Sequence, residues 1–127
     1  MKTFINLPVR DLSRTIAFFS RLGLSFDPQA AGEETACMLI SDDACVMLHT
    51  RESFALFTGK AVTDTSTSRE VIVGLSADSR EQVDELVDKA VAAGAQPMGA
   101  SQNQDYMYMR GFCDLDGHQW SFLYMSM

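Results

Sequence analysis

The chain has 127 residues, of which 46% are hydrophobic and 21% charged, a composition typical of one globular domain rather than a disordered chain or a coiled coil. The 17 Asp and Glu against 10 Lys and Arg give a formal net charge of −7, which argues against a nucleic-acid-binding surface. No stretch approaches the roughly 20 apolar residues of a membrane span, and the apolar run at the start is too short for a signal peptide. Three cysteines without Cys-x-x-Cys spacing favour a reduced, cytoplasmic protein.

The first half of the chain predicts one strand, one helix and three further strands. Residues 3–9 alternate between apolar and polar positions, as in a half-buried strand. Asp11 is expected to cap a helix whose apolar residues repeat at helical spacing, and Gly23 is expected to end it. Strands at 24–27, 35–41 and 44–49 should follow.

The second half predicts the same order of elements. Residues 70–76 alternate, Asp78 is expected to cap a helix with Glu81 completing a capping box, and strands should follow at 96–101, 105–113 and 118–124. The repeat predicts one α+β domain over 1–127 with two β-α-β-β-β modules, at about 1–50 and 70–127. Residues 51–69 form the predicted linker, in which 52–57 could form one or two amphipathic helical turns.

Two segments carry a family resemblance. They are Leu-Pro-Val-Arg-Asp-Leu-Ser-Arg-Thr-Ile-Ala-Phe-Phe at residues 7–19 and Asp-Leu-Asp-Gly-His-Gln-Trp-Ser-Phe at residues 114–122. With the duplicated order of elements, they closely resemble the vicinal oxygen chelate superfamily, which includes glyoxalase I, extradiol dioxygenases, and the bleomycin and fosfomycin resistance proteins. The resemblance covers essentially the whole chain. It implies an open, curved mixed sheet from the two modules, with helices outside and a cleft enclosed between the modules.

The resemblance also implies four positions for a divalent metal ion, usually occupied by His and Glu in the enzymes of the superfamily. In this sequence these positions hold Phe4, Met47, Ile72 and Ser121. Phe and Ile have no lone pair to donate, and a thioether or a hydroxyl is a poor ligand for Zn, Ni, Mn or Fe(II). We therefore expect no metal ion and no cofactor.

Alternation separates a face beneath each helix from an open face that lines the implied cleft. Ile5, Leu7 and Val9 should pack under the first helix, as should Trp120 and Phe122 under the second. The open faces are then expected to bind a ligand through Phe4, Asn6, Met47, His49, Ile72 and Ser121. For Asn6 the alternative is a bond to a neighbouring strand or water, and for His49 a solvated position at a strand end.

Tyr106, Tyr108 and Arg110 share one face of a predicted strand. If that face points inward, its aromatic rings and cation would suit an anionic planar ligand. If it points outward, the three side chains form an exposed or dimer-facing stripe. The sequence leaves both alternatives open, and the ligand-binding prediction includes all three residues.

These observations predict a metal-independent small-molecule-binding protein that holds its ligand in the cleft and has no catalytic residue. The alternative is an enzyme of the same superfamily, such as a glyoxalase-like lyase or isomerase. We expect no nucleic-acid or membrane partner. We also expect a homodimer, because the apolar residues Phe54, Leu56 and Phe57 need cover.

Overall fold

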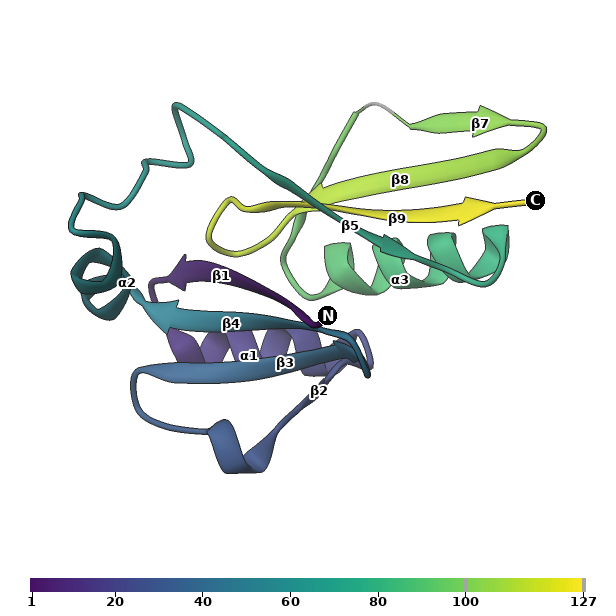
Figure 1. Cartoon of the computed structure of the whole chain (residues 1–127). Coiled ribbons are helices and arrows are strands. Elements are labelled where there is room, and N and C mark those ends of the chain that lie inside the picture. Colours follow the sequence, from purple (N-terminus) through teal and green to yellow (C-terminus); the bar gives the residue numbers. More distant parts are fainter. Residues whose placement is uncertain (100, 127) are drawn as a thin grey trace. The chain divides into compact units, whose positions relative to one another are not determined.

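The computed structural model describes residues 1–99 and 101–126 (Figure 1). The chain divides into two compact units, Met1–Thr63 and Asp64–Met127. No helix in these described residues is long and apolar enough to cross a membrane.

The first unit holds a four-stranded sheet in the order β1-β4-β3-β2. Its elements are β1 (Thr3–Val9), α1 (Leu12–Arg21), β2 (Ser25–Phe26), the 3₁₀ helix η1 (Pro28–Ala30), β3 (Thr35–Ser41), β4 (Ala44–Thr50) and α2 (Arg51–Thr58). Strands β1 and β4 pair in parallel, whereas β3 is antiparallel to both β4 and β2. Helix α1 supplies the crossover that a parallel pair requires.

The second unit repeats this order in a sheet arranged β5-β9-β8-β6, with β7 paired to β8. Its elements are β5 (Ile72–Ser76), α3 (Arg80–Ala92), β6 (Gln96–Pro97), β7 (Gln102–Gln104), β8 (Met107–Cys113) and β9 (Gln119–Met125). Again the first and last strands, β5 and β9, are parallel. The predicted α+β fold with open mixed sheets is confirmed, and the second unit carries one short strand, β7, beyond the predicted β-α-β-β-β order. The strand predicted at 96–101 is only two residues long, and residue 100 lies outside the described residues.

The helix caps were predicted correctly for α1 and wrongly for α3. Asp11 accepts a hydrogen bond from the Arg14 amide, and Gly23 beyond the helix has a φ of 95°, in the left-handed region. At α3 the cap is Ser79 rather than Asp78, because the extended backbone of Ser79 directs its hydroxyl to the Gln82 amide. The Asp78 amide donates a hydrogen bond to Gln82 Oε1. Gln82, rather than the predicted Glu81, therefore supplies the side chain that bonds the backbone before the helix.

Burial confirms which strand faces pack beneath the helices. In the first unit Val9 and Val46 are fully buried, together with Phe19 of α1. In the second unit Trp120 and Phe112 are buried on the sheet face that α3 covers. The two helices therefore cover the apolar faces that alternation predicted, and the opposite faces of the sheets remain more polar and more open.

The turn between β8 and β9 is organised by one buried carboxylate, Asp114. One of its oxygens accepts hydrogen bonds from the amides of Asp116 (2.9 Å) and His118 (3.0 Å), and the other accepts from Trp120 Nε1 (2.9 Å). Gly117 has a φ of 82°, in the left-handed region, and an added Cβ there would clash with Thr65 Oγ1. The Asp-Leu-Asp-Gly-His-Gln-Trp segment is therefore a structural motif that fixes the turn and anchors the core Trp.

Replacing Asp114 should destabilise the protein strongly. Asp114→Ala removes the carboxylate that accepts from three N–H groups of this turn, and we expect the free energy of unfolding to fall by about 3 kcal/mol. Chemical denaturation followed by Trp120 fluorescence measures this loss. Glu33→Ala, on an exposed loop, is the control and should leave stability unchanged. Equal stability of the two variants would contradict the role given to Asp114.

Candidate functional site

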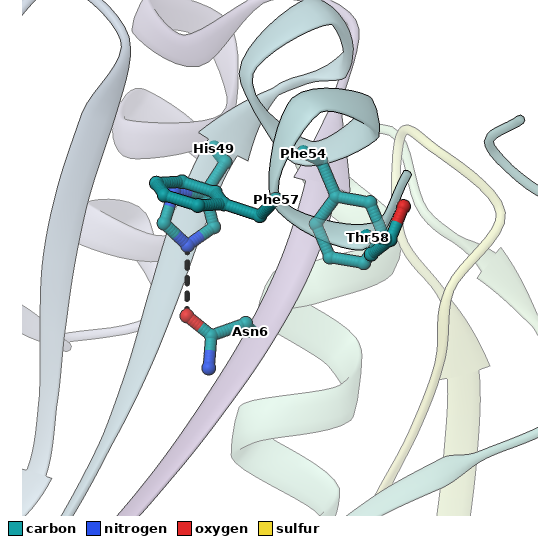
Figure 2. Close-up of a pocket in the computed structure, with 5 residues that line it drawn as sticks. All are labelled: Asn6, His49, Phe54, Phe57 and Thr58. Carbon is teal, nitrogen blue, oxygen red and sulfur yellow. Dashed lines mark hydrogen bonds between the residues drawn. The ribbon is translucent and has the colours of Figure 1, made fainter. Parts of the chain in front are cut away.

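A pocket of about 550 Å³ opens in the first unit between the ends of β1 and β4 and helix α2. Its lining residues are Asn6, His49, Phe54, Phe57 and Thr58 (Figure 2). The size lies within the range of pockets that hold small organic ligands. Two Phe rings, one amide, one imidazole and one hydroxyl make the pocket largely apolar, with few polar groups.

Helix α2 supplies the apolar wall. Thr50 begins the helix by accepting a bond from the Ser53 amide, and Gly59 ends it with a φ of 68°. Phe54 and Phe57 are three residues apart and therefore lie on one face of the helix, the face that lines the pocket. Leu56 lies outside this face, and its side chain is 85% exposed.

The parallel pairing of β1 with β4 brings Asn6 to His49, although 43 residues separate them. Asn6 lies opposite Met47, and Pro8 lies opposite His49. Because alternate residues of a strand share a face, Asn6 and His49 both point to the face away from α1. They meet there as diagonal neighbours, with a distance of 2.8 Å between Asn6 Oδ1 and His49 Nε2.

His49 is the centre of a hydrogen-bonded chain of three side chains. An amide oxygen can only accept, so His49 Nε2 must carry the proton that is donated to Asn6 Oδ1. In the neutral ring Nδ1 is then an acceptor, and the Thr35 hydroxyl donates to it across 3.0 Å. Both ring nitrogens are therefore occupied within the protein.

The imidazole is only 5% exposed, and this burial lowers the pKa of His49 below its ordinary value of 6.5. The Phe57 ring lies edge-on to it, with 5.3 Å between ring centroids, and the Phe54 centroid is 6.3 Å away. The apolar helix thus keeps the histidine neutral. A neutral His49 makes the polar part of the pocket uncharged.

The hydrogen-bonded chain ends at Asn6, whose side-chain amide still has donor capacity. Asn6 is an exposed residue, and in the described part of the chain its Nδ2 has no hydrogen-bond partner. Figure 2 shows Nδ2 pointing away from the His49 ring. The pocket lining therefore combines the Asn6 amino group, which carries two N–H donors, with two aromatic rings.

The structure brings together only part of the predicted ligand-binding set. Asn6 and His49 meet in the pocket, with Met47 beside Asn6 and Phe4, 56% exposed, further along β1. The remaining predicted positions of the open faces, Ile72 and Ser121, lie in the second unit on the face opposite α3. Their role in ligand binding stays a prediction.

Tyr108 and Arg110 lie on the helix-covered face of β8. The Tyr108 hydroxyl donates to Asp84 Oδ1 (2.6 Å), and Arg110 Nη1 bonds Asp84 (2.9 Å) and Asp88 (3.2 Å) of α3. These bonds lower the pKa of Asp84 and raise the pKa of Tyr108. This placement favours the outward alternative for the two residues. Tyr106, two residues earlier, is exposed.

Sequence reasoning missed Thr35, Phe54, Phe57 and Thr58 as site residues. The spacing of the two Phe residues, three apart and five positions after His49, was the available signal for an aromatic wall. Thr35 gave no signal, because only the β3–β4 register places it opposite His49. Leu56 and Phe57 (73% exposed) are uncovered as expected, and the homodimer inferred from them stays a prediction.

No group of three or more His, Cys, Asp or Glu side chains that could hold a metal ion occurs within residues 1–99 and 101–126. Of the positions that the resemblance assigned to metal ligands, Phe4 and Ile72 are exposed hydrocarbon side chains. The histidine of the first unit, His49, uses both ring nitrogens in bonds to Thr35 and Asn6.

Comparisons with known proteins agree with the fold. The family model of the Glyoxalase/Bleomycin resistance protein/Dioxygenase superfamily matches residues 3–122. A hypothetical protein from S. aureus has a similar structure, with a TM-score of 0.83, 26% identity, and coverage of 98% of this chain and 93% of that one. No functionally curated protein matches the chain.

Two further structures show the same fold at lower identity. A glyoxalase/bleomycin resistance protein/dioxygenase family enzyme from Burkholderia phytofirmans has a TM-score of 0.81 and 19% identity, with 96% of each chain covered. A fosfomycin resistance protein from Mesorhizobium loti has a TM-score of 0.69 and 13% identity, with 100% of this chain and 93% of that chain covered.

The buried His49 should make the protein less stable at acidic pH. Because the folded-state pKa lies below the unfolded value of 6.5, the contribution of His49 to stability is present above that pH and is lost as the pH falls through it. Proton NMR titration should place the His49 pKa below 6.5, with the signal assigned by its absence in His49→Gln. The variant should also lose less stability than the wild type between neutral pH and pH 5. A His49 pKa above 6.5 would contradict the burial argument.

Proposed function

The chain belongs to the glyoxalase/bleomycin resistance protein/dioxygenase superfamily, and we propose that it is a metal-independent small-molecule-binding protein. The ligand occupies the pocket of the first unit formed by β1, β4 and α2. The observation that carries this proposal is that the pocket lining combines the exposed Phe57 ring with Asn6 Nδ2, which has no hydrogen-bond partner among the described residues. Ligand-binding sites typically combine an apolar surface with a few polar groups that orient the ligand.

The chemistry of the side chains supports binding without a metal ion. Phe4 and Ile72 have no donor atoms, and Met47 and Ser121 are weak ligands for the metal ions that the superfamily uses. His49 could ligate a metal only by giving up a hydrogen bond, which would leave Thr35 or Asn6 without its partner. These residues do not fit a divalent metal site.

The pocket is also better suited to binding than to proton transfer. A general base must have a free lone pair near the proton that it removes, and His49 Nδ1 uses its lone pair for the Thr35 hydroxyl. Among the described residues that line the pocket there is no carboxylate, Lys, Arg or Cys. Its groups can orient a ligand, and we propose binding as the activity.

Substitutions in the pocket should weaken ligand binding selectively. A metabolite library screened by thermal shift supplies the ligand, and its dissociation constant is then measured by calorimetry. Phe57→Ala removes the exposed aromatic wall, and we expect about a tenfold loss of affinity. Asn6→Ala removes the free donor and should cost about the same factor.

Leu56→Ala is the matched control, because Leu56 is on the same helix and is even more exposed, yet does not line the pocket. It should bind as the wild type does. If Phe57→Ala and Leu56→Ala bind equally well, the pocket is not the ligand site. Denaturation of each variant separates loss of binding from loss of folding.

Removal of metal ions should leave binding unchanged. We expect the purified, tag-free protein to contain far less than one Zn, Ni, Mn or Fe per chain by elemental analysis. Treatment with a chelator, or addition of Ni²⁺ or Zn²⁺, should alter neither the affinity for the ligand nor the melting temperature. About one metal ion per chain, or binding that needs the added ion, would overturn the metal-independent part of the proposal.

A further inference from the structure

We infer that the pocket selects an uncharged, flat aromatic molecule that presents a hydrogen-bond acceptor, such as a carbonyl oxygen, to Asn6. This inference rests on the proposed function and names the class of ligand for the same pocket. Three features of the described residues carry it: the direction of the hydrogen-bonded chain, the absence of charge in the lining, and the arrangement of the Phe rings.

The direction of the chain sets what Asn6 can offer. Thr35 donates to His49 Nδ1, and His49 Nε2 donates to Asn6 Oδ1. With its oxygen engaged by the imidazole, the Asn6 amide is left with Nδ2, which carries two N–H donors and no acceptor. A ligand atom in contact with Nδ2 must therefore accept, and a group that only donates would face another donor.

The described lining residues offer no charged partner to a ligand of either sign. Ammonium and guanidinium groups are donors only, so they do not complement Asn6 Nδ2. A carboxylate or phosphate would accept from Nδ2, but none of the five lining residues provides a countercharge. Moving an anion into an apolar pocket without a partner is costly, and the net charge of −7 disfavours its approach.

The aromatic wall favours a flat ligand. Phe54 and Phe57 project from the same face of α2, and Phe57 is 73% exposed. One edge of the aromatic cluster is already filled by the His49 ring at 5.3 Å from the Phe57 centroid. A planar ring lying on the remaining surface would bury it in the stacked or edge-on geometry that aromatic pairs adopt.

A matched series of naphthalenes tests each feature. 2-Acetylnaphthalene is neutral and carries a carbonyl acceptor. 2-Isopropenylnaphthalene has nearly the same shape, with a methylene group in place of the oxygen, and 2-naphthoate is the anion. At neutral pH we expect 2-acetylnaphthalene to bind about tenfold more tightly than either analogue, with a shift of the Asn6 side-chain amide signals in ¹⁵N–¹H NMR spectra.

Asn6→Asp is the decisive variant. It keeps an oxygen that accepts from His49 Nε2, replaces the amide donor by an acceptor, and adds a negative charge to the lining. The preference for 2-acetylnaphthalene over 2-isopropenylnaphthalene should disappear in this variant. Asn103→Asp makes the same chemical change in β7, where the side chain bonds Arg80, and should retain the preference.

The results separate this inference from the proposed function. Equal binding of the two neutral naphthalenes, tighter binding of 2-naphthoate, or a preference that survives Asn6→Asp would each overturn the ligand class. Binding of none of the three would also overturn it. The proposed function would then still stand if a ligand from the metabolite library binds and is lost in Phe57→Ala, and would fail with the inference if no such ligand exists.

Discussion

Two strands that run in the same direction cannot be joined by a short turn, and both units of this chain place such a pair at the start of the sheet. In the first unit β1 lies beside β4, and in the second β5 lies beside β9. The helix that makes the crossover must cover one face of the pair, because its apolar side needs burial. That constraint assigns every alternate residue of these strands to the core or to the open face, and it is the reason that Asn6 and His49 meet.

The two faces of the strands carry polar clusters of different kinds. On the helix side of β8, Tyr108 and Arg110 bind Asp84, and Arg110 also pairs with Asp88, so the charged groups of this cluster have partners within the protein. On the open side of β1 and β4, Thr35, His49 and Asn6 form an uncharged chain that ends in an unused donor. The first cluster fastens a helix to a sheet. The second has bonding capacity left for another molecule, and this difference separates a structural cluster from a candidate site.

Much of the fold could be predicted from the sequence because it depends on local periodicity. Alternation located β1, and apolar spacing with Gly23 located α1. The strands predicted at 35–41 and 44–49 match β3 and β4 to within a residue. The cap of α3 was misplaced by one residue, since Asp78 and Ser79 are both good capping residues and only the backbone decides between them.

The site was harder to predict than the fold. Asn6 and His49 could be placed on one face by alternation. Their hydrogen bond, however, depends on the register between β1 and β4, which the sequence alone does not reveal. The same holds for Thr35, which comes from a third strand. For Tyr108 and Arg110 alternation gave a shared face without saying which side α3 covers. The pairing of neighbouring strands, rather than the residue pattern along one strand, determines which polar side chains meet in the pocket.

The boundary between the two units lies in a short segment without helix or strand, and this affects where the chain can be divided. The last helix of the first unit ends at Gly59, and from Thr65 onward the chain is tied to the second unit by Thr65 Oγ1 on the Asp116 carbonyl and by Arg69 on the Gly117 carbonyl. Residues 60–63 between these points belong to neither sheet. A break in the chain there would leave all the strands of each sheet on one fragment. This short segment is therefore the natural place to divide the chain into two halves, each with a complete sheet.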